Sequence, residues 1–150
     1  GEFDVIMALD VIEHIHDDSR AFRGLEMALK IGGMLIIIVP AYQWLWGVQD
    51  EVAHHFRRYT SGSLIKVLKA NSSLQIVRKT YFNTFLFPPI ALVRLIAKWF
   101  NLKERESDFE INNRFLNGLF YFIFNLETYF LKFLSFPFGV SILFVLKKND

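Results

Sequence analysis

Two apolar runs decide the fold of this 150-residue chain: Phe3-Asp4-Val5-Ile6-Met7-Ala8-Leu9 and Met34-Leu35-Ile36-Ile37-Ile38-Val39. Each run has the length and composition of a strand that is buried on both faces. Between them, residues 17–19 offer helix N-cap side chains, an amphipathic spacing follows, and Gly32-Gly33 indicates a helix stop. A strand, a helix and a strand with short links predict a βαβ unit, hence a parallel sheet with a right-handed crossover.

The rest of the chain predicts further helices and strands around this unit. We expect an ordered loop with a helical turn at 41–59, a helix at 60–70, a strand at 74–81, a helix from Pro88-Pro89 to Phe100, an exposed connection at 101–113 and a last strand at 139–146. Thr60 is the expected N-cap of its helix, and Asn71 its left-handed stop. From Phe115 an apolar stripe extends almost around the helix, which predicts that this helix is buried or faces lipid.

The composition excludes several classes of function. Lys+Arg minus Asp+Glu is 17 − 15 = +2, which is too small to indicate a nucleic-acid surface. The absence of cysteine excludes disulfides, cysteine–zinc sites and thiol catalysis. The long uncharged runs, such as residues 31–49, are broken by glycine or proline, so no spanning helix is expected. Because the chain opens without a basic signal-peptide region, we expect a cytoplasmic protein whose membrane contact, if any, is peripheral.

Phenylalanine is the unusual residue type, with 17 copies, of which 14 lie from Phe82 onward. Its side chain has no polar group, so this many rings must be buried in a core, an interface, an apolar site or lipid. All four histidines, by contrast, lie at or before His55. The chain therefore divides into a first part equipped for chemistry and an apolar second part.

Three segments of the first part resemble the class I S-adenosylmethionine-dependent methyltransferases. They are Phe3-Asp4-Val5-Ile6, Asp10-Val11-Ile12-Glu13-His14-Ile15 and Leu29-Lys30-Ile31-Gly32-Gly33-Met34-Leu35. A bacterial subgroup of that family is similar at Pro40-Ala41, Leu45-Trp46, Asp50, His54 or His55, and Arg57-Arg58-Tyr59-Thr60. The resemblance covers residues 2–84 and the last strand. It implies a Rossmann-like α/β fold, S-adenosylmethionine as cofactor, and methyl transfer to a small-molecule acceptor.

The resemblance also implies that this chain holds only part of the fold. The family's glycine-rich loop and its ribose-binding acidic residue have no counterpart here, so the chain resembles the C-terminal portion, strands 4 to 7 of the sheet. We divide it into a core part at 1–84, a Phe-rich helical insertion or cap at 85–138, and the last sheet strand at 139–150. We expect this portion alone to bind cofactor poorly and to be inactive. The first strand should lack a neighbour on one side, which predicts a homodimer through that edge or through the Phe-rich helices.

The end of the first strand is the expected cofactor site. By the resemblance, the pocket is lined by Ala8, Leu9, Asp10 and Val11, and the carboxyl end of a parallel strand is where open α/β sheets bind ligands. Just beyond, His14 is a candidate general base, unless it and Glu13 only fix the loop and cap the next helix. In quinone O-methyltransferases a similar acidic-x-x-acidic-His pattern is linked to a divalent metal, so metal binding is a third interpretation of these residues. We assign no metal-binding residue on this basis.

A second set of polar residues follows the second strand. His54 and His55 are candidate catalytic bases, and the expected substrate-binding residues are Trp46, Asp50, Arg57, Arg58 and Tyr59. An arginine there could clamp a carboxylate or phosphate of the acceptor. The other interpretation is a network of Asp–Arg and His–carboxylate contacts that stiffens a loop.

The Phe-rich region leaves the acceptor and the partners open. It predicts a lid or wall for a large apolar or lipid-like acceptor, with peripheral membrane contact, or else helices that bury their own rings or form an oligomer interface. No nucleic-acid partner is expected. Two rival functions remain, another Rossmann enzyme such as a dehydrogenase, and a non-catalytic membrane-associated or scaffolding domain that kept the fold.

Overall fold

The computed structural model describes residues 1–100 and 114–149, and the predicted connection at 101–113 lies outside these residues. Four strands form one sheet in the order β1-β2-β4-β3. They are β1 (Phe3–Leu9), β2 (Leu29–Pro40), β3 (Gln75–Phe82) and β4 (Ser141–Lys147). β1 pairs with β2 in parallel, whereas β4 runs antiparallel to both β2 and β3. The predicted βαβ unit is therefore confirmed, and the sheet as a whole is mixed rather than parallel.

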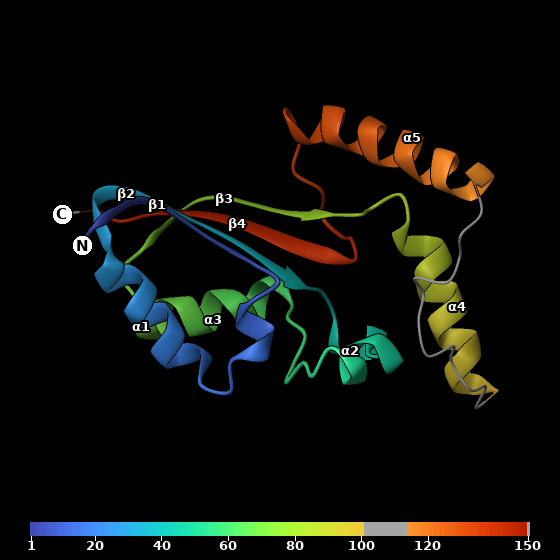
Figure 1. Cartoon of the computed structure of the whole chain (residues 1–150), viewed down its shortest axis with the longest axis horizontal. Coiled ribbons are helices and arrows are strands. Elements are labelled where there is room, and N and C mark those ends of the chain that lie inside the picture. Colours follow the sequence, from blue (N-terminus) through green and yellow to red (C-terminus); the bar gives the residue numbers. More distant parts are fainter. Residues whose placement is uncertain (101–113, 150) are drawn as a thin grey trace.

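Helices cover one face of the sheet and extend from one end of it (Figure 1). The elements other than strands are η1 (Ile12–His14), α1 (Asp18–Ala28), η2 (Gln43–Leu45), α2 (Val48–Val52), α3 (Ser61–Asn71), α4 (Phe87–Trp99) and α5 (Arg114–Leu131). α1 and α3 lie side by side under the sheet, α4 stands beyond the end of β3, and α5 lies above the end of the sheet in this view (Figure 1). The N-caps agree with the sequence, because Asp17 accepts from Arg20 N and Thr60 accepts from Ser63 N.

The core lies between the sheet and the pair α1–α3. Alternate residues of β2 and β4 face this side, and Leu35 and Ile37 pair with Leu146 and Phe144, all four fully buried. Phe22 of α1 and the residues Leu64 and Leu68 of α3 complete the contact from the helical side. Burying each such side chain contributes roughly 1.5–3 kcal/mol, so this layer holds the fold together.

β1 is the main correction to the expected burial. Its residues Phe3, Val5 and Met7 are 52%, 53% and 64% exposed, so the prediction of a strand buried on both faces is wrong. The reason is that α1 and α3 cover only the face to which Ile6 and Ala8 belong. β1 is also an edge strand, as expected. The edge and the uncovered face make β1 the most exposed apolar strand among the described residues.

Two predicted helix ends are wrong as well. α1 ends at Ala28 rather than at Gly32-Gly33, because Leu29 is fully buried and already pairs with Phe3 as part of β2. Asn71 is the last residue of α3 rather than a left-handed stop, and the chain becomes extended at Ser72. Burial of the following segment ends α1, whereas α3 ends at its C-cap Ser72, whose N–H and hydroxyl both donate to Leu68 O.

α5 is anchored near its C-terminal end but is not buried. Glu127, 3% exposed, accepts hydrogen bonds from Thr84 N and Phe85 N, and Arg78 donates to the carbonyls of Leu131 and Leu134. Most of its described apolar side chains are exposed, so of the two alternatives that the sequence left open, burial or contact with lipid, burial within the chain is not found among the described residues. Among the residues described, no helix is long and apolar enough to cross a membrane.

Candidate functional site

The carboxyl end of β1 turns sharply into η1 and presents three ionisable side chains. Asp10 has a left-handed φ of 50°, and its N–H donates to Ile38 O of β2. Glu13 is fully buried, and neither of its carboxylate oxygens has a hydrogen-bond partner among the described residues. Burial chiefly raises the pKa of Glu13 to about 7, with the nearby charge of Asp10 adding to the rise. His14, next in the chain, is exposed.

The segment after α2 brings His55 to the same place. Phe56 N donates to Glu13 O at 2.8 Å, which ties this segment to η1. The His14 and His55 rings meet edge to face with centroids 4.6 Å apart. Glu13, His14 and His55 each offer one atom that could bind a metal ion, and these three atoms lie within 4.8 Å of one another. Burial raises the pKa of Asp10, and the charges of the nearby His55 and His14 partly offset that rise. Asp10 is therefore close enough to both histidines to border the cluster.

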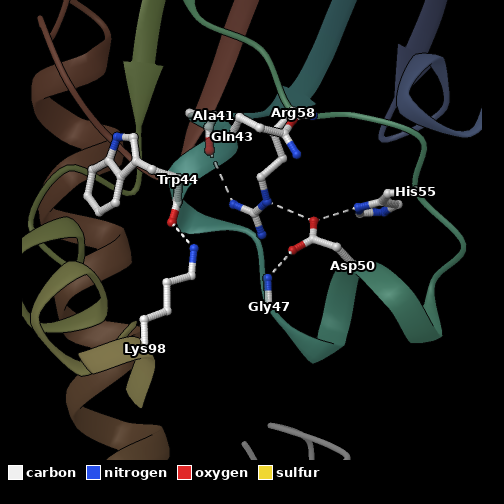
Figure 2. Close-up of polar contacts among 8 residues, drawn as sticks. All are labelled: Ala41, Gln43, Trp44, Gly47, Asp50, His55, Arg58 and Lys98. Carbon is white, nitrogen blue, oxygen red and sulfur yellow. Dashed lines mark hydrogen bonds and ion pairs between the residues drawn. The ribbon is translucent and has the colours of Figure 1, made fainter. Parts of the chain in front are cut away.

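The Asp50 carboxylate holds His55 in position through the ring nitrogen Nδ1 (Figure 2). Its carboxylate is fully buried and accepts from Arg58 Nε at 2.7 Å and from Gly47 N at 2.9 Å. His55 Nδ1 lies 2.8 Å from Asp50 Oδ1, and with Asp50 ionised that nitrogen donates. Burial would raise the pKa of Asp50, but the hydrogen bonds from Arg58, Gly47 and His55 outweigh it and hold that pKa below 3.8. This leaves Nε2 as the His55 ring nitrogen that the contact with Asp50 does not use.

Arg57 and Tyr59 connect the same loop to α1. Arg57 pairs with Asp18 at 2.9 Å and donates to His16 O, and the Tyr59 hydroxyl donates to Asp18 Oδ2 at 2.9 Å. Tyr59 and Asp50, two of the side chains predicted to contact substrate, are buried and engage partners within the chain. The predicted loop-stiffening network is present, and a direct substrate role for Arg57 or Arg58 stays a prediction.

The structure does not bring every candidate residue into the cluster. His54 is exposed, has a left-handed φ of 56°, and follows the C-cap of α2, so the two candidate histidines point to different places. Trp46 is half-buried after η2. At the expected cofactor position, Ala8 is buried, whereas Leu9, Asp10 and Val11 are exposed at the strand end.

α4 borders the polar network through an aromatic cluster. Lys98 Nζ donates to Trp44 O at 2.5 Å (Figure 2). The Phe87 ring packs against Tyr42 at 5.5 Å and against Trp44 at 5.9 Å between centroids. Sequence reasoning missed this contact, and it missed Glu127, although a lone acidic residue in the apolar run of α5 is a visible signal. The Phe-rich region therefore lies next to Tyr42 and Trp44, and Tyr42 N in turn donates to Tyr59 O at the end of the loop that carries His55.

Comparison with known proteins identifies the fold. The sequence matches no protein-family model and none of the curated proteins. Among solved structures, a candidate methyltransferase of Bacillus halodurans C-125 superposes with a TM-score of 0.55 at 18% identity, over 99% of this chain. An S-adenosylmethionine-dependent methyltransferase of Mesorhizobium loti gives 0.54 at 11% identity over 97%. Phosphoethanolamine N-methyltransferase 2 of Haemonchus contortus, in complex with S-adenosylmethionine, gives 0.52 at 16% identity over 99%.

The chain spans 65%, 62% and 34% of the lengths of these three proteins. The cyclase SpnF shares the fold too, with a TM-score of 0.50 at 16% identity, over 99% of this chain and 50% of its own. A fold shared at this level does not decide the reaction, which must be argued from the site. The predicted fold class is confirmed: this chain has the Rossmann-like α/β fold of the S-adenosylmethionine-dependent methyltransferases.

Proposed function

We propose that the protein containing this chain transfers a methyl group from S-adenosylmethionine to a small acceptor. One observation carries the proposal: the ends of parallel strands β1 and β2 bring Asp10, Glu13, His14 and His55 together at the edge where α/β sheets bind ligands. The fold supports the same reaction class. The chain spans 65% of one related structure and 34% of another, so the rest of each has no counterpart here. Activity is therefore proposed for the whole protein that contains this chain.

His55 is the proton acceptor in this proposal. Asp50 engages Nδ1 at 2.8 Å, which fixes the tautomer and leaves Nε2 as the basic atom of the ring. When bound, S-adenosylmethionine supplies the methyl group, whose bond to sulfur breaks as the acceptor oxygen or nitrogen bonds to carbon. The proton of that oxygen or nitrogen passes to His55 Nε2. His14, edge-on to His55, is the second candidate for the same step.

The strand end fits the apolar part of the cofactor. Leu9 and Val11 are each 43% exposed on either side of Asp10, and this surface could pack a purine ring. A hydroxyl or amino group of the nucleoside could donate to the Asp10 carboxylate. Ala8, buried beneath, would set the floor of the pocket. These four residues are the proposed cofactor-binding set, and the methionine part would be held outside this chain.

An apolar or lipid-like acceptor is the finer proposal. Its support is the exposed aromatic surface of α4, where Trp99 and Phe100 are 86% and 67% exposed, on the helix whose Lys98 contacts Trp44. Exposed apolar patches of this kind mark contacts with ligands, membranes or proteins. A cytoplasmic protein that meets its acceptor at a membrane surface would use such a helix, and Arg57, which is more exposed than Arg58, would then face the polar end of the acceptor.

The test uses the product of the complete reading frame that contains this chain, next to the 150-residue chain itself. Calorimetric titration with S-adenosylmethionine should show binding to the former and weak or no binding to the latter. In a radiolabelled methyl-transfer assay, His55→Ala should lower kcat by about 100-fold or more, with the cofactor Kd nearly unchanged. His54→Ala is the matched control, with near wild-type turnover. Absence of cofactor binding by the complete product rejects methyl transfer, and unchanged turnover in His14→Ala, His54→Ala and His55→Ala alike rejects the base.

A second candidate function is a non-catalytic membrane-associated or scaffolding domain. The observation that favours it is the exposed apolar surface of α5 and of the turn that follows it, where Tyr121 and Phe133 are 71% and 75% exposed. Such a domain would bind vesicles or a second copy without binding S-adenosylmethionine. Co-sedimentation with lipid vesicles, combined with the calorimetric titration, separates it from the enzyme.

A further inference from the structure

The cluster of Glu13, His14 and His55 contains a polar group that the fold leaves without a partner. Glu13 has no exposed surface, and both of its carboxylate oxygens lack hydrogen-bond partners among the described residues. A buried carboxylate without partners costs several kcal/mol unless a cation or a proton compensates it. The cost points to a ligand, because the groups nearby include the imidazoles of His14 and His55, which can bind an ion, beside the Asp10 carboxylate.

The three side chains come from two segments that the backbone holds together. Glu13 and His14 belong to η1, and His55 follows α2, with the Phe56 N to Glu13 O hydrogen bond of 2.8 Å closing the pair. Their ligand atoms lie within 4.8 Å of one another. Bonds of imidazole nitrogen and carboxylate oxygen to a transition metal are about 2.0–2.2 Å, so a small closing movement of the side chains would bring all three onto one ion.

His55 already has the support that a metal-binding histidine needs. Its Nδ1 is engaged by Asp50 Oδ1 at 2.8 Å, and Asp50 is in turn fixed by Arg58 at 2.7 Å. Metal-bound histidines almost always donate their other ring N–H to a carboxylate, carbonyl or water, which orients the ring. Because this arrangement commits Nδ1, Nε2 is the atom that can bind an ion.

We propose that Glu13, His14 and His55 form a binding site for a divalent transition-metal ion, with Asp50 as a positioning residue. Two imidazoles and one carboxylate suit Zn²⁺, Co²⁺ or Ni²⁺, whereas Mg²⁺ and Ca²⁺ prefer oxygen ligands. This metal site is a separate property from the proposed methyl transfer. Since the ion and the transferred proton would use the same nitrogen of His55, occupancy by the ion excludes His55 as the base.

The experiment is a titration of the tag-free chain with ZnCl₂, and with MgCl₂ as the ion control. We expect one Zn²⁺ per chain by calorimetry and no Mg²⁺ binding at the same concentrations. Co²⁺ in place of Zn²⁺ should give visible absorption bands typical of nitrogen and oxygen ligands. His14→Ala and His55→Ala should weaken Zn²⁺ binding by more than the roughly 10–100-fold expected for the positioning variant Asp50→Asn.

Two histidines outside the cluster provide matched controls. His54→Ala, one residue away from His55, and His16→Ala, two residues away from His14, should bind Zn²⁺ as the wild type does. His14 is exposed, so His14→Ala tests the site without disturbing the core. No stoichiometric binding by the wild type, or equal binding by the His14 and control variants, overturns the proposal. Neither outcome depends on methyl transfer, so the two proposals fail separately.

Discussion

Replacing Asp50 with alanine should destabilise the chain by about 3–5 kcal/mol, the cost of removing one partner from a buried ion pair. Asp50 has no exposed side-chain surface, and its partner Arg58 is only 9% exposed. The substitution removes the acceptor of Arg58 Nε at 2.7 Å, of Gly47 N at 2.9 Å and of the His55 ring at 2.8 Å. The Arg58 charge would stay buried, with only the Ala41 carbonyl at 3.2 Å left to its side chain among the described contacts.

That loss is large against the 5–15 kcal/mol that typically stabilises a domain. Urea unfolding followed by circular dichroism at pH 7 measures it, with the denaturant slope as a check for two-state behaviour. The control is Glu51→Ala, a neighbouring acidic residue of α2 that is exposed and should change the stability by about 0.5 kcal/mol or less. A loss below about 1 kcal/mol for Asp50→Ala, or equal losses in both variants, refutes the reasoning.

The pH dependence of the same residue provides an independent check. Because the folded pKa of Asp50 lies below 3.8, its contribution is complete above about pH 3.8 and is lost as the pH falls through the folded pKa. Asp50→Asn should remove this acid-dependent part of the unfolding curve. An unchanged acid transition in Asp50→Asn would show that other carboxylates control it.

Three further substitutions test other parts of the structure. Burial raises the pKa of Glu13 from 4.5 to about 7, so the stability of the wild type should decline between about pH 4.5 and pH 7. Glu13→Gln should abolish that decline. Parallel profiles of Tm against pH for the wild type and the variant, measured with EDTA present, would contradict this. Glu127→Ala leaves Thr84 N and Phe85 N unpaired, so about 1–3 kcal/mol should be lost and amide exchange in α5 should rise, unlike in the exposed control Asn125→Ala. Met7→Lys should reduce self-association through the β1 edge in sedimentation velocity, whereas Met27→Lys on α1 should not; a monomeric wild type would refute the edge contact.

Local signals in the sequence predicted most of the elements. Apolar runs and caps such as Asp17 and Thr60 specify strands and helices within a few residues, so the order β-α-β, then helix, strand, two helices and strand, is correct. Helix ends were predicted less well, because Gly32-Gly33 and Asn71 are stop signals that act only when tertiary contacts leave the preceding residues helical. Leu29 instead gains more from burial in β2 than from one more helical turn.

The candidate site divides in the same way. The sequence supplied the histidines and carboxylates and placed them at strand ends, but it treated His54 and His55 as equivalent. Only the fold distinguishes them, because the turn after α2 directs His55 to Asp50 and His14 and leaves His54 exposed. Burial determines the partners of the other polar residues. Asp50 and Tyr59 carry polar groups typical of a binding surface, yet both are buried and their hydrogen-bond partners belong to the same chain.

The sequence by itself determined the α/β class, the position of the chemistry near the ends of the first two strands, and the apolar character of the region after Phe82. These properties depend on residue type and short-range periodicity, which are local. Tertiary structure alone decided that Glu13 is buried without a partner among the described residues, that His55 joins it, and that Phe122, Phe124 and Phe130 of α5 are exposed. Such properties depend on which segments distant in sequence pack together, and no local pattern encodes that.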